Sequence, residues 1–257
     1  MPSQTQPAGD GGGLFRPTLG EELDEPDRKR ELNREIFTKI AREYDRVCKW
    51  ISFGRDLKWK QKLVRRLPDR PAPKCVDLAA GTGDLSFYLG ERYPDGEVLG
   101  IDLTEKMIEV ADGRNGLENV RFELGDMAAL DMADGSVDIV TGGYALRNAP
   151  VLREAIGEVH RILKPDGLAA FLDFSKPKNR FVQFLNIASL KVWMSLCGLM
   201  LHFKPWVYGY IADSLSKFPD RSALEQLFRE EGFEVVEREL HFFGVMEKVV
   251  VRKIEPH

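Results

Sequence analysis

The sequence has little cysteine and little histidine: its 257 residues include three cysteines and four histidines. Cys48, Cys75 and Cys197 are far apart and show no CxxC spacing, which argues against a disulfide framework and against a zinc site. We therefore expect no bound metal and a reducing, cytoplasmic setting. Cys75 lies in a short apolar run and is predicted to be a small core residue.

An excess of positive charge is also absent, since 37 lysines and arginines stand against 41 aspartates and glutamates, for a formal net charge of −4. This balance argues against a nucleic-acid-binding protein, which usually carries a dominant basic face. The N-terminal residues MPSQTQPAGDGGG lack the basic stretch and the apolar run of a secretory signal. Their glycine, proline and glutamine content predicts a disordered tail over residues 1–30.

The sequence offers no clear transmembrane span. Residues 181–203 form an apolar run long enough to cross a bilayer, but Lys191 stands in its middle. A lysine at the centre of a membrane costs about 2.5–3.5 kcal/mol. The segment is therefore predicted to be a helix that is buried on one side.

Hydrophobic spacing predicts helices over residues 32–45 and 57–67, and from residue 73 short apolar strands alternate with helices. Such an alternation indicates an α/β fold with a parallel sheet covered on both faces. The strands of this series are predicted at 74–79, 97–102, 120–124, 137–142 and 168–174. A helix at 222–231 then precedes two strands about two residues apart, at 235–242 and 245–253, which predict a closing antiparallel hairpin.

Residues 31–257 are interpreted as one domain. Between the last parallel strand and the hairpin lies an insertion, residues 176–220, with almost no strand signal. This insertion and the N-terminal helices, within 32–67, are both expected to lie as a cap over the carboxyl edge of the sheet. Open α/β folds bind their ligands at that edge.

A glycine-rich turn, DLAAGTGD at residues 77–84, follows the first strand and opens a helix. Gly81 and Gly83 let the backbone turn sharply and approach a ligand closely. The fingerprint of dinucleotide-binding proteins is incomplete, because Ser86 takes the place of its last glycine. Asp84 also stands where a pyrophosphate would need a bare helix N-terminus. The turn therefore favours a ligand without phosphates, and a tight turn that binds nothing is the simpler alternative.

Two further carboxylates follow successive strands. Asp102 ends the second strand, 19 residues after Gly83, where a carboxylate can accept both ribose hydroxyls of a nucleoside. Asp126 follows the third strand and could bind an adenine amino group, with Met127 packed on the ring. The alternatives are an acid that stabilises a helix N-terminus at Asp102 and an ordinary loop residue at Asp126. The three signals together favour a nucleoside site.

Longer motifs are more diagnostic than the glycine turn: they are DLAAGTGDL (77–85), GYALRN (143–148), RILKPDG (161–167), DFSKP (173–177), YGYIADSLSKFPD (208–220) and YDRVCKWISFGRDLKWK (44–60). These motifs resemble those of the ubiquinone/menaquinone biosynthesis C-methyltransferases, which are class I S-adenosylmethionine-dependent methyltransferases. The resemblance covers residues 33–253. It departs at Cys48 and Lys49, near which the family usually has asparagine.

The resemblance implies a Rossmann-like class I methyltransferase fold, with a seven-stranded, mostly parallel sheet, a C-terminal antiparallel hairpin and a helical cap. It also implies S-adenosyl-L-methionine as the cofactor. The positions that match cofactor-contacting residues or belong to the same loops are Asp77, Gly81, Thr82, Gly83, Asp102, Leu103, Asp126, Met127 and Gly143. At Gly143 the missing side chain would leave room for a ligand, and a strand-end bulge is the alternative.

The implied reaction is C-methylation of a polyprenylated quinol precursor, either demethylmenaquinol or a 2-methoxy-6-polyprenyl-benzoquinol. The acceptor must lose a phenolic proton to become a carbon nucleophile. Arg147 is not an ordinary base, because its pKa exceeds about 12, but it can stabilise a phenolate or hold a water that Asn148 orients. Tyr144 completes the predicted catalytic set, and Tyr44 and His202 are weaker candidates. A structural salt bridge is the alternative role of Arg147.

The apolar insertion suits an acceptor with a lipid tail. Its large side chains are expected to line an apolar tunnel: Phe181, Phe184, Leu185, Leu190, Trp193, Leu196, Met200, Phe203 and Trp206. Packing on the domain core or a homodimer interface is the alternative. Because a polyprenyl tail resides in the membrane, transient contact with the membrane surface is expected without an anchor.

Three other functions stay open on the sequence. The chain could methylate another small aromatic or lipid-like acceptor, bind the cofactor as a non-catalytic subunit, or act as a nicotinamide dehydrogenase. Ser86 and Asp84 disfavour the dehydrogenase, and the intact Arg147-Asn148 pair speaks against the non-catalytic subunit.

Overall fold

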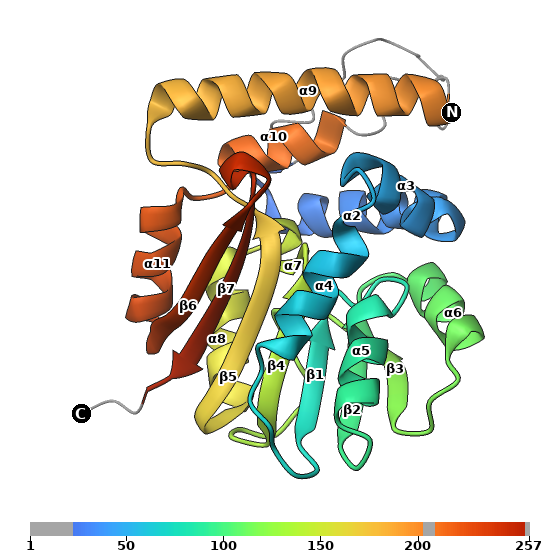
Figure 1. Ribbon diagram of the computed structural model, residues 1–257, viewed down its shortest axis with the longest axis vertical. Coiled ribbons are helices and arrows are strands. Elements are labelled where there is room, and N and C mark those ends of the chain that lie inside the picture. The colour runs from blue at the N-terminus through green and yellow to red at the C-terminus, as the bar shows by residue number, and fades with distance from the viewer. Residues whose placement is uncertain (1–22, 203–208, 255–257) are drawn as a thin grey trace, which may run out of the picture.

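A seven-stranded sheet forms the centre of the protein in the computed structural model, which describes residues 23–202 and 209–254 (Figure 1). The strands lie side by side in the order β3-β2-β1-β4-β5-β7-β6. Their bounds are β1 Lys74–Leu78, β2 Glu97–Asp102, β3 Val120–Leu124, β4 Val137–Gly143, β5 Leu163–Phe174, β6 Phe233–His241 and β7 Met246–Lys253. The first five pair in parallel, and β7 runs antiparallel to both β5 and β6. The predicted mostly parallel sheet with a closing antiparallel hairpin is confirmed.

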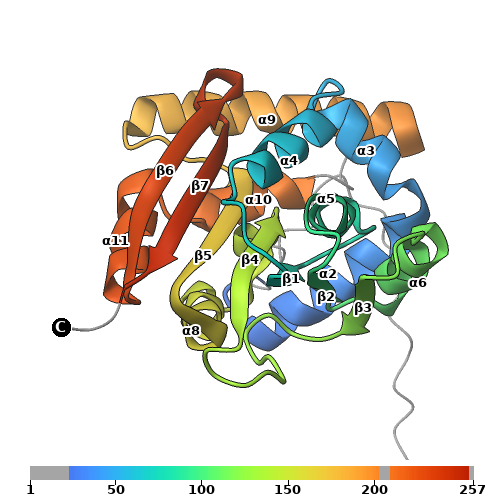
Figure 2. The ribbon, with the colours of Figure 1, turned by 60° about the horizontal axis from the view of Figure 1, so that its bottom comes forward.

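Helices cover both faces of this sheet and its carboxyl edge (Figures 1 and 2). The helices are α2 Pro26–Ile40, α3 Tyr44–Ile51, α4 Asp56–Arg65, α5 Asp84–Arg92, α6 Glu105–Arg114, α7 Ala145–Asn148, α8 Leu152–Ile162, α9 Arg180–His202, α10 Gly209–Lys217 and α11 Arg221–Glu230. In Figure 1, α4 and α5 lie on the near face of the sheet and α8 on the far face, while α9 and α10 cross above its upper edge. The chain order of the strands reverses between β1 and β4, so ligand-binding groups are expected above this point.

The N-terminal helices differ from their prediction in two ways. The first helix begins at Pro26, six residues earlier than expected, because a proline is well tolerated in the first turn of a helix. The predicted tail over 1–30 therefore ends in helix, and its residues 1–22 lie outside the described residues. A short 3-10 turn, η1 Ala41–Glu43, then separates α2 from α3. Ile36, Ile40 and Tyr44 keep helical spacing across that turn, which is why the sequence predicts one helix.

Two strand boundaries also differ. The link between β6 and β7 has four residues instead of two and contains the 3-10 turn η2 Phe242–Gly244, in which Phe242 and Gly244 have positive φ angles. The longer link brings Phe242 to a pocket under the cap. β5 begins at Leu163 rather than Leu168, and its first residues, LKPDG, have the composition of a turn.

The long apolar helix α9 packs across the carboxyl edge and is held there partly by its one internal charge. Lys191 Nζ lies 2.8 Å from Asp213 Oδ1 on α10. The lysine is therefore ion-paired, and its side chain is exposed. Across residues 23–202 and 209–254, no helix combines the length and the apolar character that crossing a bilayer requires.

Gly83 is a position where the fold requires glycine. Its φ is +92°, and a Cβ there would lie 2.8 Å from the rings of Phe87 and Phe122. We expect Gly83→Ala to lower the free energy of unfolding by about 1–3 kcal/mol, because overpacking adds to the strain of a left-handed backbone. Gly113→Ala in α6 is the matched control, because its added Cβ would meet nothing within 4 Å. Urea denaturation should show the control unchanged or slightly stabilised, and equal stability of both variants would contradict the packing argument.

Candidate active site

A polar pocket lies at the carboxyl ends of β1, β2, β3 and β4. Five residues predicted to bind the cofactor line it: Asp102, Leu103, Asp126, Met127 and Gly143. Its other walls come from the loop after β1, through Ala79, and from α2, through Asn33 and Phe37. The N-terminal helix therefore closes a pocket whose floor is the sheet edge. Among the described residues that line the pocket there is no lysine or arginine.

Asp102 connects the two halves of this polar pocket. Its Oδ2 accepts a hydrogen bond from the backbone N–H of Gly81 at 2.8 Å, and its Oδ1 accepts one from Thr104 at 2.9 Å. The first bond fixes the glycine-rich turn and the second satisfies the N-terminus of α6. Thr104 is the N-cap residue of α6, but its own side chain makes no capping bond. Burial raises the pKa of Asp102 above its ordinary value although these N–H groups lower it.

Asp126 joins the floor of the polar pocket to α2. Its Oδ2 accepts a hydrogen bond from Arg30 Nε at 2.7 Å, and its Oδ1 accepts one from the backbone N–H of Ala128 at 2.9 Å. Gly143 contributes by its missing side chain, since a Cβ there would lie 3.1 Å from Leu85 Cδ1. No local pattern points to Arg30, which lies 96 residues from Asp126 along the chain.

The remaining predicted cofactor residues support the polar pocket from beside it. Asp77 and Thr82 line a small pocket that shares Tyr44, Ala79 and Gly143 with the polar pocket. Gly81 and Gly83 form the turn between them and line neither pocket.

Asp77 is buried under the turn. Its carboxylate accepts hydrogen bonds from Ser86 Oγ at 2.7 Å and Thr141 Oγ1 at 2.8 Å. Burial raises the pKa of Asp77 to about 6, although both hydroxyls lower it. Thr82 Oγ1 donates to Asp45 Oδ1 at 2.5 Å, which ties the turn to α3.

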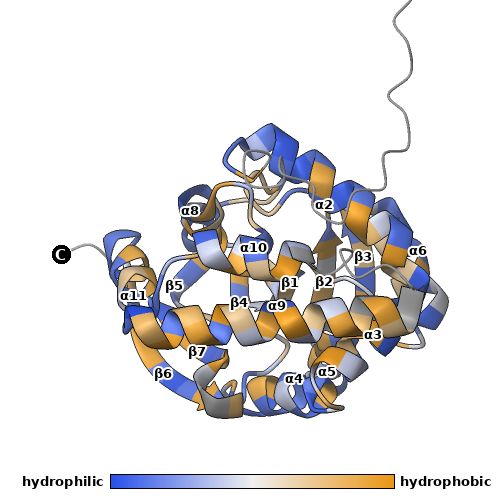
Figure 3. Ribbon diagram, turned by 90° about the horizontal axis from the view of Figure 1, so that it is seen from above, coloured by the Kyte–Doolittle hydropathy of each residue, from blue (hydrophilic) through white to orange (hydrophobic). Residues whose placement is uncertain are grey.

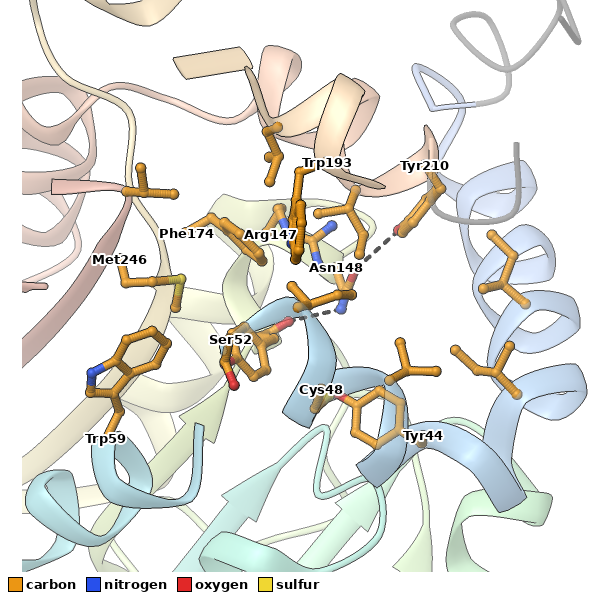
Figure 4. A pocket seen from close by; sticks show the side chains of 18 of the residues that line it. Tyr44, Cys48, Ser52, Trp59, Arg147, Asn148, Phe174, Trp193, Tyr210 and Met246 are labelled. Carbon is orange, nitrogen blue, oxygen red and sulfur yellow. Dashed lines mark hydrogen bonds between the residues drawn. The ribbon is translucent and has the colours of Figure 1, made fainter. Parts of the chain in front are cut away.

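A second, apolar pocket adjoins the polar one beneath the cap (Figure 4). Helices α2, α3, α9 and α10 and the β6–β7 link all contribute to it. The side chains that form its apolar walls include Ile36, Ile40, Val47, Trp59, Phe174, Leu190, Trp193, Ile211, Phe242 and Met246. Phe37, Tyr44 and Asn148 line both pockets, so the two spaces meet at these three residues.

Arg147 and Asn148, both predicted to be catalytic, face the apolar pocket from α7 (Figure 4). Arg147 is 4% exposed; its Nη1 donates to Ser214 Oγ at 2.5 Å, and its Nε lies 3.7 Å from Asp173 Oδ1. Its guanidinium also lies over the rings of Phe174 and Tyr210, at 5.4 and 5.8 Å. Arg147 therefore makes the ion pair that a structural role would require, and it also lines the apolar pocket, as a catalytic role would require.

Asn148 lies in a hydrogen-bond network that joins three segments. Its Nδ2 donates to the backbone oxygen of Tyr144 at 2.8 Å, and its own backbone oxygen accepts from Asn33 Nδ2 at 2.8 Å. The Tyr210 hydroxyl lies 3.0 Å from Asn148 Oδ1 and also contacts Asn33 Oδ1. Burial raises the pKa of Tyr210 to about 12. This network fixes the orientation of the Asn148 amide at the junction of the two pockets.

Tyr144, the third predicted catalytic residue, presents its ring to the apolar pocket and its hydroxyl to a buried carboxylate. The hydroxyl donates to Asp56 Oδ1 at 2.5 Å, and Lys60 Nζ lies 2.8 Å from Asp56 Oδ2 and 3.0 Å from Asp84 Oδ2. Burial, followed by the charge of Asp56, holds the pKa of Tyr144 well above its ordinary value. Tyr144 is therefore a neutral hydrogen-bond donor at neutral pH.

The tunnel predicted along the insertion is wrong for most of its residues. Leu190 and Trp193 line the apolar pocket, as expected. Five of the others are exposed on the outer side of α9, because a helix has only one side toward the core: Phe181, Phe184, Leu185, Leu196 and Met200. Phe203, Trp206 and the side chain of the weaker catalytic candidate His202 lie outside the described residues. Tyr44, the other weaker candidate, lines both main pockets and the small one.

Sequence reasoning missed Asn33, Asp56 and Tyr210 as site residues. Asp56 and Tyr210 stand inside two of the family-like motifs, RDLKWK and YGYIADSL, but neither motif shows which of its side chains points inward. Asn33 carries no motif signal, and its role depends on a contact with Asn148, 115 residues away.

Comparison with known proteins points to one family. The model of the ubiE/COQ5 methyltransferase family matches residues 25–252. The demethylmenaquinone methyltransferase of Geobacillus kaustophilus is 35% identical over 221 residues, which are 84% of this chain and 94% of that protein. The demethylmenaquinone methyltransferase of Symbiobacterium thermophilum is 34% identical over 233 residues, or 86% of this chain and 92% of that protein.

Solved structures agree on the fold. A SAM-dependent methyltransferase from Aquifex aeolicus superposes with a TM-score of 0.57 at 16% identity and covers 93% of this chain and 100% of its own. Identity this low shows the shared fold alone, and that fold is the class I methyltransferase fold that the motifs predict.

The raised pKa of Asp77 makes stability depend on pH in a definite direction. The folded carboxyl holds its proton up to about pH 6, whereas the ordinary value is 3.8. The contribution of the Asp77 carboxyl to the free energy of unfolding is therefore complete below its ordinary pKa of 3.8. This contribution is lost as the pH rises through its pKa in the folded protein, about 6. The non-titrating variant Asp77→Asn should gain about 3 kcal/mol relative to the wild type between about pH 4 and pH 7.

Urea denaturation across this pH range measures the difference. Asp138→Asn is the control, and its stability relative to the wild type should change with pH in the opposite direction. The reason is that the hydrogen bond from Lys164 lowers the pKa of Asp138 despite its partial burial. A difference between Asp77→Asn and wild type that does not change with pH would contradict the assignment.

Proposed function

The chain belongs to the ubiE/COQ5 methyltransferase family, and from this premise we propose that it transfers a methyl group from S-adenosyl-L-methionine to a ring carbon of a lipid-tailed quinol in respiratory quinone biosynthesis. The membership predicted from the motifs is confirmed. The observation that carries the proposal is the junction of an acid-lined polar pocket with an apolar pocket at Phe37, Tyr44 and Asn148. One pocket that offers two carboxylates, next to a pocket with mainly apolar walls, suits a polar methyl donor and a hydrophobic acceptor.

The chemistry of the polar pocket fits S-adenosyl-L-methionine. Asp102 and Asp126 offer carboxylate oxygens, and no described lysine or arginine lines the pocket. Such a lining favours a ligand with hydroxyl and amino donors and a positive charge, and it opposes the phosphates of a nicotinamide dinucleotide. The lining of the polar pocket therefore supports a methyltransferase over the alternative of a nicotinamide dehydrogenase.

We assign the cofactor contacts by what each residue can still bind. Asp102 accepts backbone N–H groups from Gly81 and Thr104 and lines the polar pocket, so we assign its carboxylate to the ribose hydroxyls. Asp126 and Met127 would hold the adenine, and Leu103 would cover the nucleoside from the pocket wall. Gly143 would leave space between the polar pocket and the small pocket, both of which it lines.

The other predicted cofactor residues act mainly through the turn. Gly81 and Gly83 shape it, while Thr82 anchors it to α3 through Asp45. Asp77 sits beneath it and places a carboxyl group beside the small pocket.

The bound cofactor supplies a methyl group on a positively charged sulfur, which is an activated leaving group. The residues of this chain must then orient the acceptor, exclude water and stabilise the phenolate that makes its ring carbon nucleophilic. Arg147 suits the last task, because its guanidinium lies buried in the pocket wall and stays charged at neutral pH. Asn148, fixed by Tyr144 and Tyr210, would orient the acceptor hydroxyl or a water that takes its proton.

Tyr144 contributes through its position. Its hydroxyl is committed to Asp56, so it cannot also serve as a base, but its ring forms part of the wall next to Phe174, 5.8 Å away between centroids. We therefore assign Tyr144 to shaping the acceptor pocket.

For the acceptor we propose demethylmenaquinol, because the Geobacillus kaustophilus and Symbiobacterium thermophilum relatives are named demethylmenaquinone methyltransferase. The apolar pocket would hold the ring, and the tail would extend toward α9. Transient contact with a membrane surface follows from such a tail, and the homodimer stays a prediction from the sequence.

Methyl transfer from isotope-labelled S-adenosyl-L-methionine tests the function directly. We expect the full chain to methylate demethylmenaquinol at a ring carbon, located by mass spectrometry, and to methylate a 2-methoxy-6-polyprenyl-benzoquinol less efficiently. Cofactor binding without ring methylation of either quinol would instead support the non-catalytic subunit. Transfer to a quinol oxygen would contradict the C-methylation.

The role of Arg147 predicts a loss of turnover with retained cofactor affinity. Removing a preorganised electrostatic donor costs about 10²–10³ in turnover, so Arg147→Gln should fall in this range. Arg147→Lys should recover only part of the activity, because lysine keeps the charge and loses the planar fork. Raising the pH should restore some turnover to Arg147→Gln, since solvent then removes more of the phenolic proton.

The ion pair with Asp173 requires a stability control, because a buried carboxylate without its partner is destabilising. Turnover against pH is therefore measured together with affinity for S-adenosylhomocysteine and with the unfolding midpoint. Normal turnover of folded Arg147→Gln at neutral pH would return Arg147 to a purely structural role.

A further inference from the structure

Exposed hydrophobic side chains are concentrated on one face of the protein. Fifteen large hydrophobic residues are exposed in the described part of the chain, and eleven of them lie on α9 or between residues 50 and 57. On α9 the most exposed are Val192, Phe181 and Phe184, at 72%, 69% and 67%. Figure 3 looks down on this face and shows hydrophobic residues along the length of α9.

The outer residues of α9 form a continuous stripe. Phe181, Leu185, Val192, Leu196 and Leu199 recur at spacings of three, four and seven, which places them on one side of a helix. The opposite side of α9 is buried through Leu190, Met194 and Cys197. The helix therefore has two apolar sides, and packing among residues 23–202 and 209–254 accounts for only one of them.

The stripe continues onto the turn between α3 and α4. Trp50, Phe53 and Leu57 are exposed there, and the Phe53 ring stacks on Trp193 of α9 with 4.5 Å between centroids. Trp193 also lines the apolar pocket. The exposed apolar face thus reaches the wall of the proposed acceptor site.

Charge on this face is positive, although the chain as a whole is acidic. No aspartate or glutamate occurs in α9, and Asp56, the one acidic residue of residues 46–60, is buried. Exposed basic residues flank the apolar residues along the chain: Arg46, which pairs with Glu43, and Lys49, Arg55, Lys58, Lys178 and Arg180. The face therefore combines apolar side chains with positive charge, in a protein whose net charge is −4.

From this combination we propose that the outer side of α9 and the turn at residues 49–58 form a docking surface for an anionic phospholipid bilayer. Large apolar side chains enter the boundary between headgroups and acyl chains, and the surrounding lysines and arginines contact the phosphates. The inference rests on the proposed function, because docking here places the acceptor pocket against the membrane that holds a quinol tail.

A second copy of the chain fits this face less well. A two-fold dimer would bring the same patch against itself and set Lys49, Arg55, Lys58, Lys178 and Arg180 against their own copies. An anionic bilayer supplies the opposite charge, and it requires no complementary shape.

Vesicle sedimentation of the full chain tests the proposal. We expect binding to vesicles of phosphatidylcholine mixed with phosphatidylglycerol, weaker binding at high salt, and little binding to phosphatidylcholine alone. The triple variant Phe184→Ser, Val192→Ser, Leu196→Ser should lower the partition coefficient by about 100-fold or more. The matched control is Leu124→Ser, Val236→Ser, Ile254→Ser, which removes three exposed hydrophobic residues elsewhere and should bind as the wild type does.

Activity on a short-chain, water-soluble quinol separates this proposal from the proposed function. The α9 variant should methylate that quinol at the wild-type rate and lose activity only on a long-tailed quinol in vesicles. If the proposed function fails, neither quinol is methylated, yet the sedimentation result still decides the docking surface. Absence of wild-type binding to the mixed vesicles, or undiminished binding by the α9 variant, would overturn the proposal. The proposal would also be overturned if the wild type is a dimer that does not bind vesicles and light scattering shows that the α9 variant is a monomer.

Discussion

The site depends on one carboxylate that holds two backbone segments together. Asp102 accepts N–H groups from Gly81 in the turn after β1 and from Thr104 at the start of α6, at 2.8 and 2.9 Å. The parallel pairing of β1 with β2 brings these segments to the same edge of the sheet. Because a charge with hydrogen-bonded neighbours can be buried, Asp102 can serve as both a structural anchor and a ligand acceptor. The polar pocket therefore depends on Asp102, because the same carboxylate holds the two backbone segments and faces the ligand space.

The cap is joined to this edge by polar contacts at a few positions. Arg30 binds Asp126, and Asn33 and Tyr210 converge on Asn148, so helices from opposite ends of the chain are fixed to the loops after β3 and β4. The apolar pocket lies between these contacts. Its character follows from the cap, which supplies most of its walls, whereas the carboxylates of the polar pocket come from the carboxyl ends of β2 and β3. This division explains how one scaffold can hold a charged donor beside a hydrophobic acceptor.

Two buried cations near the acceptor pocket, Lys60 and Arg147, lie beside carboxylates. Lys60 lies between Asp56 and Asp84, and the two carboxylates raise its pKa although burial alone lowers it. Arg147 lies near Asp173 and over two aromatic rings. Such pairing fixes side chains in place at little net gain in stability. The exposed side of α9 shows the contrasting case, in which apolar groups have no partner within the described chain.

The sequence by itself determined the sheet, the family and the positions of Asp102 and Asp126, because these depend on local patterns. Strand and helix periodicity is a property of neighbouring residues, and the carboxyl ends of parallel strands must share an edge. The tertiary structure alone decided the rest. It brought Asn33, Tyr210 and Asn148 together across more than 60 residues, and it turned most of the predicted tunnel residues of α9 outward. An apolar helix that is hydrophobic on two sides has no periodicity that tells which side packs inward, so only its contacts with α3 and α10 could determine this.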